Sequence, residues 1–127
     1  MAEKKYNVAV VGATGLVGRT MLSIMEEYNL PVKKVYALAS SRSVGARIPF
    51  KDSELIVSEL ETFDFSLAEI GLFSPGASVS AIYAPQAADA GCVVIDNTSQ
   101  FRYEDDIPLV VTEVNPHAIG DYKNQRI

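Results

Sequence analysis

Three evenly spaced glycines are the clearest candidate for chemistry in this sequence. Gly12, Gly15 and Gly18 follow the apolar run 8–11 directly and open a segment of helical periodicity. In such a strand-to-helix turn the first glycine permits a tight turn, the second lets a pyrophosphate approach the main chain, and the third lets the helix pack closely. The spacing is a variant of the commoner G-x-G-x-x-G. We interpret it as a dinucleotide-binding loop; the alternative is a sharp turn without a ligand.

Residues 40–43, Ser-Ser-Arg-Ser, indicate which dinucleotide to expect, because they follow the second apolar run, 35–39. An NAD site usually has Asp or Glu near the end of this strand, where its carboxylate accepts hydrogen bonds from the ribose 2′-hydroxyl. The hydroxyls of Ser40 and Ser43 and the guanidinium of Arg42 can instead bind a 2′-phosphate, which a carboxylate would repel. We therefore predict NADP as the cofactor. The alternative for Arg42 is an exposed loop charge.

Two further loops follow apolar runs on what should be the same side of the sheet. The first is the loop with Ser74, Gly76 and Ser78, where a ligand could approach the backbone closely and bind the hydroxyl groups. A turn with a helix cap explains these residues equally well. Arg102 belongs to the polar stretch 96–102, where it can clamp an oxyanion. An ion pair with the aspartates at 105 and 106 is an equal competitor for that guanidinium.

Cys92 and His117 are the only cysteine and the only histidine in the chain. Cys92 precedes an apolar run and suits a buried thiol better than a nucleophile, while His117, beside Pro116, suits a structural or solvent-facing role. One cysteine and one histidine supply neither a catalytic pair nor a zinc site. We predict no metal site and no catalytic residue in this chain.

The elements that must position these loops alternate between β-branched runs and helical segments. Strands are expected over 8–11, 35–39, 55–57, 70–73, 93–95 and 109–111. A first helix is expected to open at Gly15–Gly18. A second is expected over 77–90, with Pro85 as a kink or inner boundary and Gly91 as the residue that ends it. A third, short helix is expected to follow Asn115 as its cap, with Pro116 as its first residue. The fold class is therefore α/β, a doubly wound, mainly parallel Rossmann-type sheet in three layers.

Length and composition exclude several classes of protein. The 127 residues are 48% hydrophobic and 21% charged, which suits one soluble domain. A net charge of −5 disfavours nucleic-acid binding, and neither a membrane-spanning run nor a signal peptide is recognisable, so a cytoplasmic location is expected. Acidic residues concentrated between the third and fourth runs are interpreted as a solvated connection: Asp52, Glu54, Glu59, Glu61, Asp64 and Glu69.

Taken together, the motifs resemble those of aspartate-semialdehyde dehydrogenase in order along the whole chain. They are Val11–Gly18, Ala39–Ser43, Leu72–Ser80, Val94–Arg102 and Val110–His117. The resemblance implies that Thr14, Gly15, Leu16 and Val17 contact the cofactor pyrophosphate and that Ser40, Arg42 and Ser43 surround the 2′-phosphate. It also implies that the loop 74–78 flanks the nucleotide, that Arg102 binds inorganic or substrate phosphate, and that Asn97 lies close to that site.

The same resemblance implies that residues 1–127 are the NADP-binding domain only. In the family, the nucleophilic cysteine, the base histidine and the dimerising domain come after the position of Ile127, and Cys92 does not match that nucleophile. The complete enzyme is expected to be a homodimer or homotetramer that reduces L-aspartyl-4-phosphate to the semialdehyde with release of phosphate. An N-acetylglutamyl-phosphate reductase-like domain and a non-enzymatic NADP-sensing module are the alternatives.

Overall fold

The computed structural model describes residues 4–127 and places five strands of that range in one sheet. The strands lie in the order β5-β2-β1-β6-β7, and every neighbouring pair is parallel. Their bounds are β1 Tyr6–Val11, β2 Val32–Ala39, β5 Ser58–Glu59, β6 Ile70–Phe73 and β7 Val93–Asp96. Because the buried parts of the central strands are nearly continuous apolar runs, both faces of this sheet must be covered.

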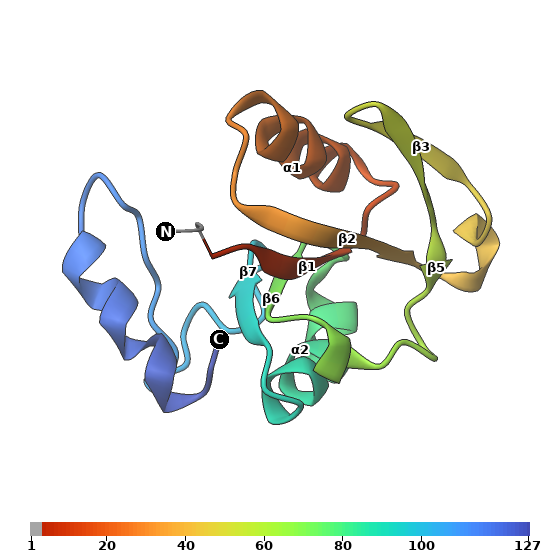
Figure 1. Cartoon of the computed structure of the whole chain (residues 1–127). Coiled ribbons are helices and arrows are strands. Elements are labelled where there is room, and N and C mark those ends of the chain that lie inside the picture. The colour runs from red at the N-terminus through yellow and green to blue at the C-terminus, as the bar shows by residue number, and fades with distance from the viewer. Residues whose placement is uncertain (1–3) are drawn as a thin grey trace.

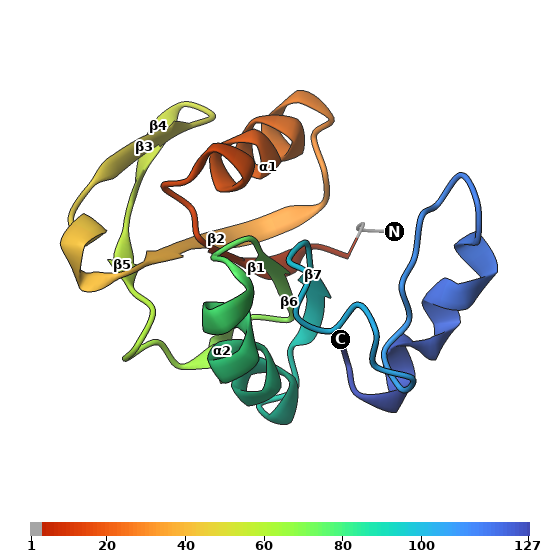
Figure 2. The same cartoon turned by 180° about the vertical axis from the view of Figure 1, so that it is seen from behind.

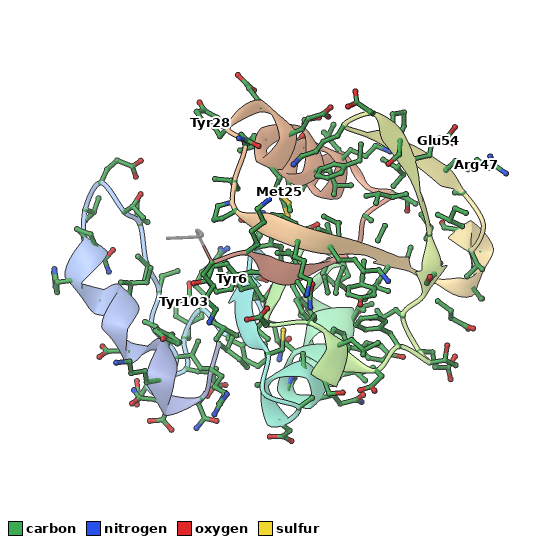
Figure 3. All side chains as sticks on the ribbon, viewed as in Figure 1. Tyr6, Met25, Tyr28, Arg47, Glu54 and Tyr103 are labelled. Atoms are coloured by element: carbon green, nitrogen blue, oxygen red, sulfur yellow. The ribbon has the colours of Figure 1, made fainter. Side chains whose placement is uncertain are left out.

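One helix covers each face of the sheet (Figure 1). On one face, α1 (Leu16–Glu27) packs Leu22 and Met25 against the buried valines of β1 and β2, and Figure 3 shows Met25 pointing from the helix toward the sheet. On the other face, α2 (Ala77–Asp89) packs its buried alanines against Phe73. The three-layer, doubly wound α/β fold is therefore confirmed.

The segment between β2 and β6 differs from the expected sheet strand over 55–57. It forms an antiparallel hairpin of β3 (Arg47–Phe50) and β4 (Ser53–Ile56), and only the short β5 then joins the parallel sheet. Ile48 and Phe50 alternate with exposed residues and pack in the same core as α1. The hairpin therefore extends the layer of α1, as Figure 2 shows.

The second helix is confirmed, but Pro85 does not bound it. α2 continues from Pro85 to Asp89 without a break. Pro85 is exposed, so water can reach the carbonyl that loses its N–H partner. Gly91 ends the helix as expected, with a φ of +97° and its N–H donating to the carbonyl of Ala88 at 3.0 Å.

Residues 97–127 contain no strand, so the expected strand over 109–111 is wrong. The side-chain amide of Asn115 accounts for the difference, because its Oδ1 accepts the Val111 N–H at 2.7 Å and its Nδ2 donates to the Leu109 carbonyl at 2.8 Å. A helix does begin at Pro116, but η3 (Pro116–Asn124) is a 3₁₀ helix, and the Asn115 side chain does not cap it. The Leu109 carbonyl and both backbone groups of Val111 are thus engaged locally rather than in the sheet.

Candidate functional site

Loops at the carboxyl ends of the parallel strands surround a cleft of about 480 Å³. Polar and glycine residues from three loops line it: Gly12, Thr14 and Gly15 after β1, Ser40 and Ser41 after β2, and Ser74 with Pro75 after β6. The order of strands reverses at β1, since β2 lies on one side of it and β6 on the other. Ligands of open parallel sheets bind at this edge, next to such a switch point.

Backbone contacts require two of the three glycines of the first loop. Gly12 has a φ of +85°, and a Cβ there would lie 2.7 Å from the Ser74 carbonyl oxygen. A Cβ on Gly18 would lie 2.1 Å from the Gly12 carbonyl oxygen, so α1 can begin against the loop only with glycine at 18. Gly15 differs, because its φ is −77° and its Cβ would approach only Gly12, at 3.4 Å. The fold tolerates a side chain at 15, whereas a ligand close to the main chain would not.

Both α-helices begin at this edge without a side-chain cap. Gly15 and Gly76 occupy the N-cap positions of α1 and α2, and neither first turn contains an acidic residue. The first N–H groups of a helix have no intrahelical acceptor and carry the positive end of the helix dipole. Two such N-termini at one sheet edge provide donors suited to a pyrophosphate.

Several predicted site residues lie at the same edge but outside the walls of the cleft: Leu16, Val17, Arg42, Ser43, Gly76 and Ser78. Leu16 is 85% exposed at the start of α1. Ser43 Oγ lies 3.5 Å from Thr14 Oγ1, which joins the glycine loop to the short 3₁₀ helix η1 (Ser41–Ser43).

Arg42 lies in the middle of η1 with its side chain exposed. Over residues 4–127, the one ion pair within 4.0 Å joins Lys4 to Glu69, so Arg42 makes none. Its guanidinium is thus available to a ligand beside the serines at 40 and 41.

Sequence reasoning missed five residues that line the cleft: Glu59, Leu60, Glu61, Val79 and Tyr83. Two of them belong to the acidic stretch that we interpreted as a solvated connection, and that interpretation fails at Glu59, which is partly buried. The expected strand over 55–57 did not identify Glu59, because Glu59 reaches this edge through β5, a separate strand that the chain forms only after the hairpin. Val79 and Tyr83 come from α2, whose helical register would have identified them.

The loop after β7 is held at its start by Asp96. One carboxylate oxygen, Oδ1, accepts hydrogen bonds from Ser80 Oγ at 3.1 Å and from the Thr98 N–H at 2.9 Å, and Oδ2 accepts one from Thr98 Oγ1 at 3.0 Å. Asn97 donates its backbone N–H to the Phe73 carbonyl at 2.8 Å and exposes its side chain. Asp96 thus ties α2 to the loop that carries Asn97.

Arg102 does not line this cleft. It lines a second hollow, of about 530 Å³, between β7 and residues 97–127, where the other lining side chains include Ile107, Leu109 and Tyr122. Figure 1 shows this C-terminal segment beyond β7, on the side of the sheet opposite the hairpin. Arg102 is exposed, and the ion pair that we considered with the aspartates at 105 and 106 does not form.

Cys92 is fully buried, as expected, and burial raises the pKa of its thiol to about 11. A thiol of that pKa is protonated at neutral pH and therefore unreactive. Across residues 4–127, no three His, Cys, Asp or Glu side chains gather as metal ligands would. None of the helices in that range is long and apolar enough to cross a membrane.

Comparison with known proteins shows the family to which the chain belongs. A family model described as semialdehyde dehydrogenase, NAD binding domain, matches residues 7–122. The aspartate-semialdehyde dehydrogenase of Legionella pneumophila is 57% identical over 124 residues, which are 98% of this chain and 36% of that protein. The crystal structure of aspartate semialdehyde dehydrogenase II from Vibrio cholerae, complexed with ASA, superposes with a TM-score of 0.96 at 51% identity and covers 98% of this chain and 37% of its own.

A more distant similarity is to the crystal structure of aspartate semialdehyde dehydrogenase with NADP from Candida albicans. It has a TM-score of 0.80 at 26% identity and covers 92% of this chain and 36% of its own. The chain belongs to the semialdehyde dehydrogenase family, whose NAD-binding domain it contains. It spans a little over a third of the length of the aspartate-semialdehyde dehydrogenases that it matches.

Proposed function

We propose that this chain is the NADP-binding domain of an enzyme that reduces L-aspartyl-4-phosphate to L-aspartate 4-semialdehyde with release of phosphate. The observation that carries the proposal is Gly15, which lines the cleft at an uncapped helix N-terminus although the fold does not require glycine there. A dinucleotide pyrophosphate explains both features. The identity of 57% to an aspartate-semialdehyde dehydrogenase supports the choice of substrate.

The residues at this edge fit a dinucleotide. Thr14 and Gly15 would hold the pyrophosphate together with the N–H groups of the first turn of α1, and Ser74 would flank the nucleotide. Ser40 and Arg42 would hold the 2′-phosphate. When bound, NADPH supplies the hydride for the reduction. The Candida enzyme, whose structure was determined with NADP, supports the same cofactor here.

The chain alone is proposed to bind the nucleotide without turning over substrate. Its single cysteine, Cys92, is buried and protonated, and therefore cannot act as the nucleophile. Arg102 and Asn97 are proposed to serve the phosphate and substrate in a complete enzyme, where residues outside this chain would adjoin the hollow beside β7. We also propose that this enzyme is a cytoplasmic homodimer or homotetramer.

The test is a calorimetric titration of the chain with NADP and with NAD. Arg42→Ala should weaken NADP binding by about 1.5–3 kcal/mol and NAD binding far less, because only NADP loses a charge-assisted hydrogen bond. Arg47→Ala is the matched control, since Figure 3 shows Arg47 pointing away from the sheet at the outer side of the hairpin. Equal weakening of both nucleotides by Arg42→Ala would show that this arginine does not read the 2′-phosphate.

A further inference from the structure

The second strand of the sheet, β2, ends without an acidic residue, but Glu59 of the neighbouring strand lies beside its end. Glu59 is the last residue of β5 and pairs with Ala39, the last residue of β2, so the two strands end at the same level of the sheet. Glu59 is partly buried and lines the cleft together with Ser40 and Ser41. The acid usually found at the end of the second strand is thus supplied by the neighbouring strand.

The same strand end contacts the segment that carries the cation. β5 packs against η1, whose central residue is Arg42. Glu59 and Arg42 are not within ion-pair distance of each other, since the single pair found in residues 4–127 is Lys4–Glu69. Neither group neutralises the other directly, and each can act on a ligand at this edge.

We propose that Glu59 is a specificity-determining residue that favours NAD and opposes NADP. This inference depends on the proposed function, in that the cleft must bind a dinucleotide. A carboxylate accepts hydrogen bonds from the ribose hydroxyls of NAD, and it repels the 2′-phosphate of NADP. Arg42 acts in the opposite sense. The preference for NADP is therefore the difference between two opposing charges and is smaller than Arg42 alone would produce.

The alternative source of negative charge at the cleft is Glu61, which lines it two residues later but is exposed and lies beyond the strand end. Solvent screens an exposed carboxylate more strongly than a partly buried one. Glu59, being paired with the end of β2, is the residue placed to discriminate at the ribose.

The experiment measures dissociation constants of NADP and NAD for the chain with Glu59→Gln, which removes the charge and keeps the shape. NADP should bind about threefold to tenfold more tightly and NAD about threefold more weakly. The gain for NADP should shrink in about 0.5 M salt, because it is electrostatic. The control is Glu54→Gln, which changes the net charge by the same amount as Glu59→Gln. Figure 3 shows Glu54 on the outer side of the hairpin, so this variant should leave the dissociation constants of NADP and NAD unchanged.

Opposite movement of the two affinities supports the inference. An unchanged ratio of NADP to NAD affinity in Glu59→Gln, or the same shift in Glu54→Gln, overturns it while leaving the proposed function intact. Failure of the unsubstituted chain to bind either nucleotide overturns the proposed function and this inference together. Glu59→Ser provides a second measurement of the same ratio if the glutamine variant is not folded, as judged by circular dichroism.

Discussion

Substituting alanine at Gly15 and at Gly18 should separate the requirements of the fold from those of the ligand. At Gly18 the added Cβ would lie 2.1 Å from the Gly12 carbonyl oxygen and 2.8 Å from the Ala13 Cα. Non-bonded atoms settle at about 3.5–4.0 Å, so the start of α1 must move by about 1.4 Å or more. Overpacking of this kind costs about 3 kcal/mol, from which the better helix propensity of alanine recovers about 1 kcal/mol.

Gly15→Ala should behave in the opposite way. Its backbone, with φ −77° and ψ 169°, suits alanine, and its Cβ meets only the Gly12 carbonyl oxygen at 3.4 Å. The expected loss of stability is that of a poorer N-cap, about 1 kcal/mol or less. NADP affinity should fall about tenfold or more, since the methyl group adds bulk to the wall of the cleft beside the helix N-terminus.

Urea unfolding followed by circular dichroism, together with NADP titration, measures both quantities for each variant. Gly18→Ala should lower the urea midpoint by about 1 M, given a slope near 2 kcal/mol/M. Gly120→Ala is the control, because a Cβ there meets nothing within 4 Å and Gly120 lies in η3, away from the cleft. Undiminished NADP binding by Gly15→Ala would refute the assignment of this loop to the pyrophosphate.

Two further predictions concern the buried thiol and the second hollow. Cys92 should react with a thiol reagent at pH 8 only after urea unfolding. Burial raises the pKa of its thiol from the ordinary value of 9.0 to about 11, so the contribution of Cys92 to the free energy of unfolding should fall as pH rises through that interval. Cys92→Ala should lose this part of the pH dependence. Rapid labelling of the folded chain would contradict its burial. In a chimaera where this chain replaces the matching region of a full-length relative, Arg102→Ala should raise the KM for phosphate in the oxidation of aspartate semialdehyde and leave the Kd of NADP unchanged. Equal effects on both constants would place Arg102 outside the phosphate site.

Most of the fold could be predicted because its central strands are short apolar runs bounded by glycine turns and helical segments. The strand at 109–111 shows the limit of that signal. Its β-branched residues indicate a strand, but pairing depends on a neighbour with free backbone groups, and the Asn115 amide occupies the N–H of Val111 and the carbonyl of Leu109. The edge of β7 instead meets the end of the chain, where the Val94 N–H donates to the Arg126 carbonyl at 2.7 Å.

The cleft could be predicted where a strand and its following loop adjoin in sequence, as at Gly12, Ser40 and Ser74. It could not be predicted where residues reach it from across the sheet. Glu59 stands next to the end of β2 only because the hairpin returns the chain to the sheet for two residues, and this detour depends on the packing of Ile48 and Phe50 against α1. Patterns within a short stretch of sequence do not predict a pairing between strands that lie this far apart along the chain.

A residue-resolved NMR titration of the chain with NADP tests directly whether this edge of the sheet is a dinucleotide-binding site. We expect the amide signals that shift to belong to the three loops of the cleft, with the largest changes at Gly12, Thr14 and Gly15, followed by Ser40 and Ser74. Shifts confined to the hollow beside β7, or no shifts at millimolar NADP with the chain folded, would contradict the assignment of the dinucleotide to this edge.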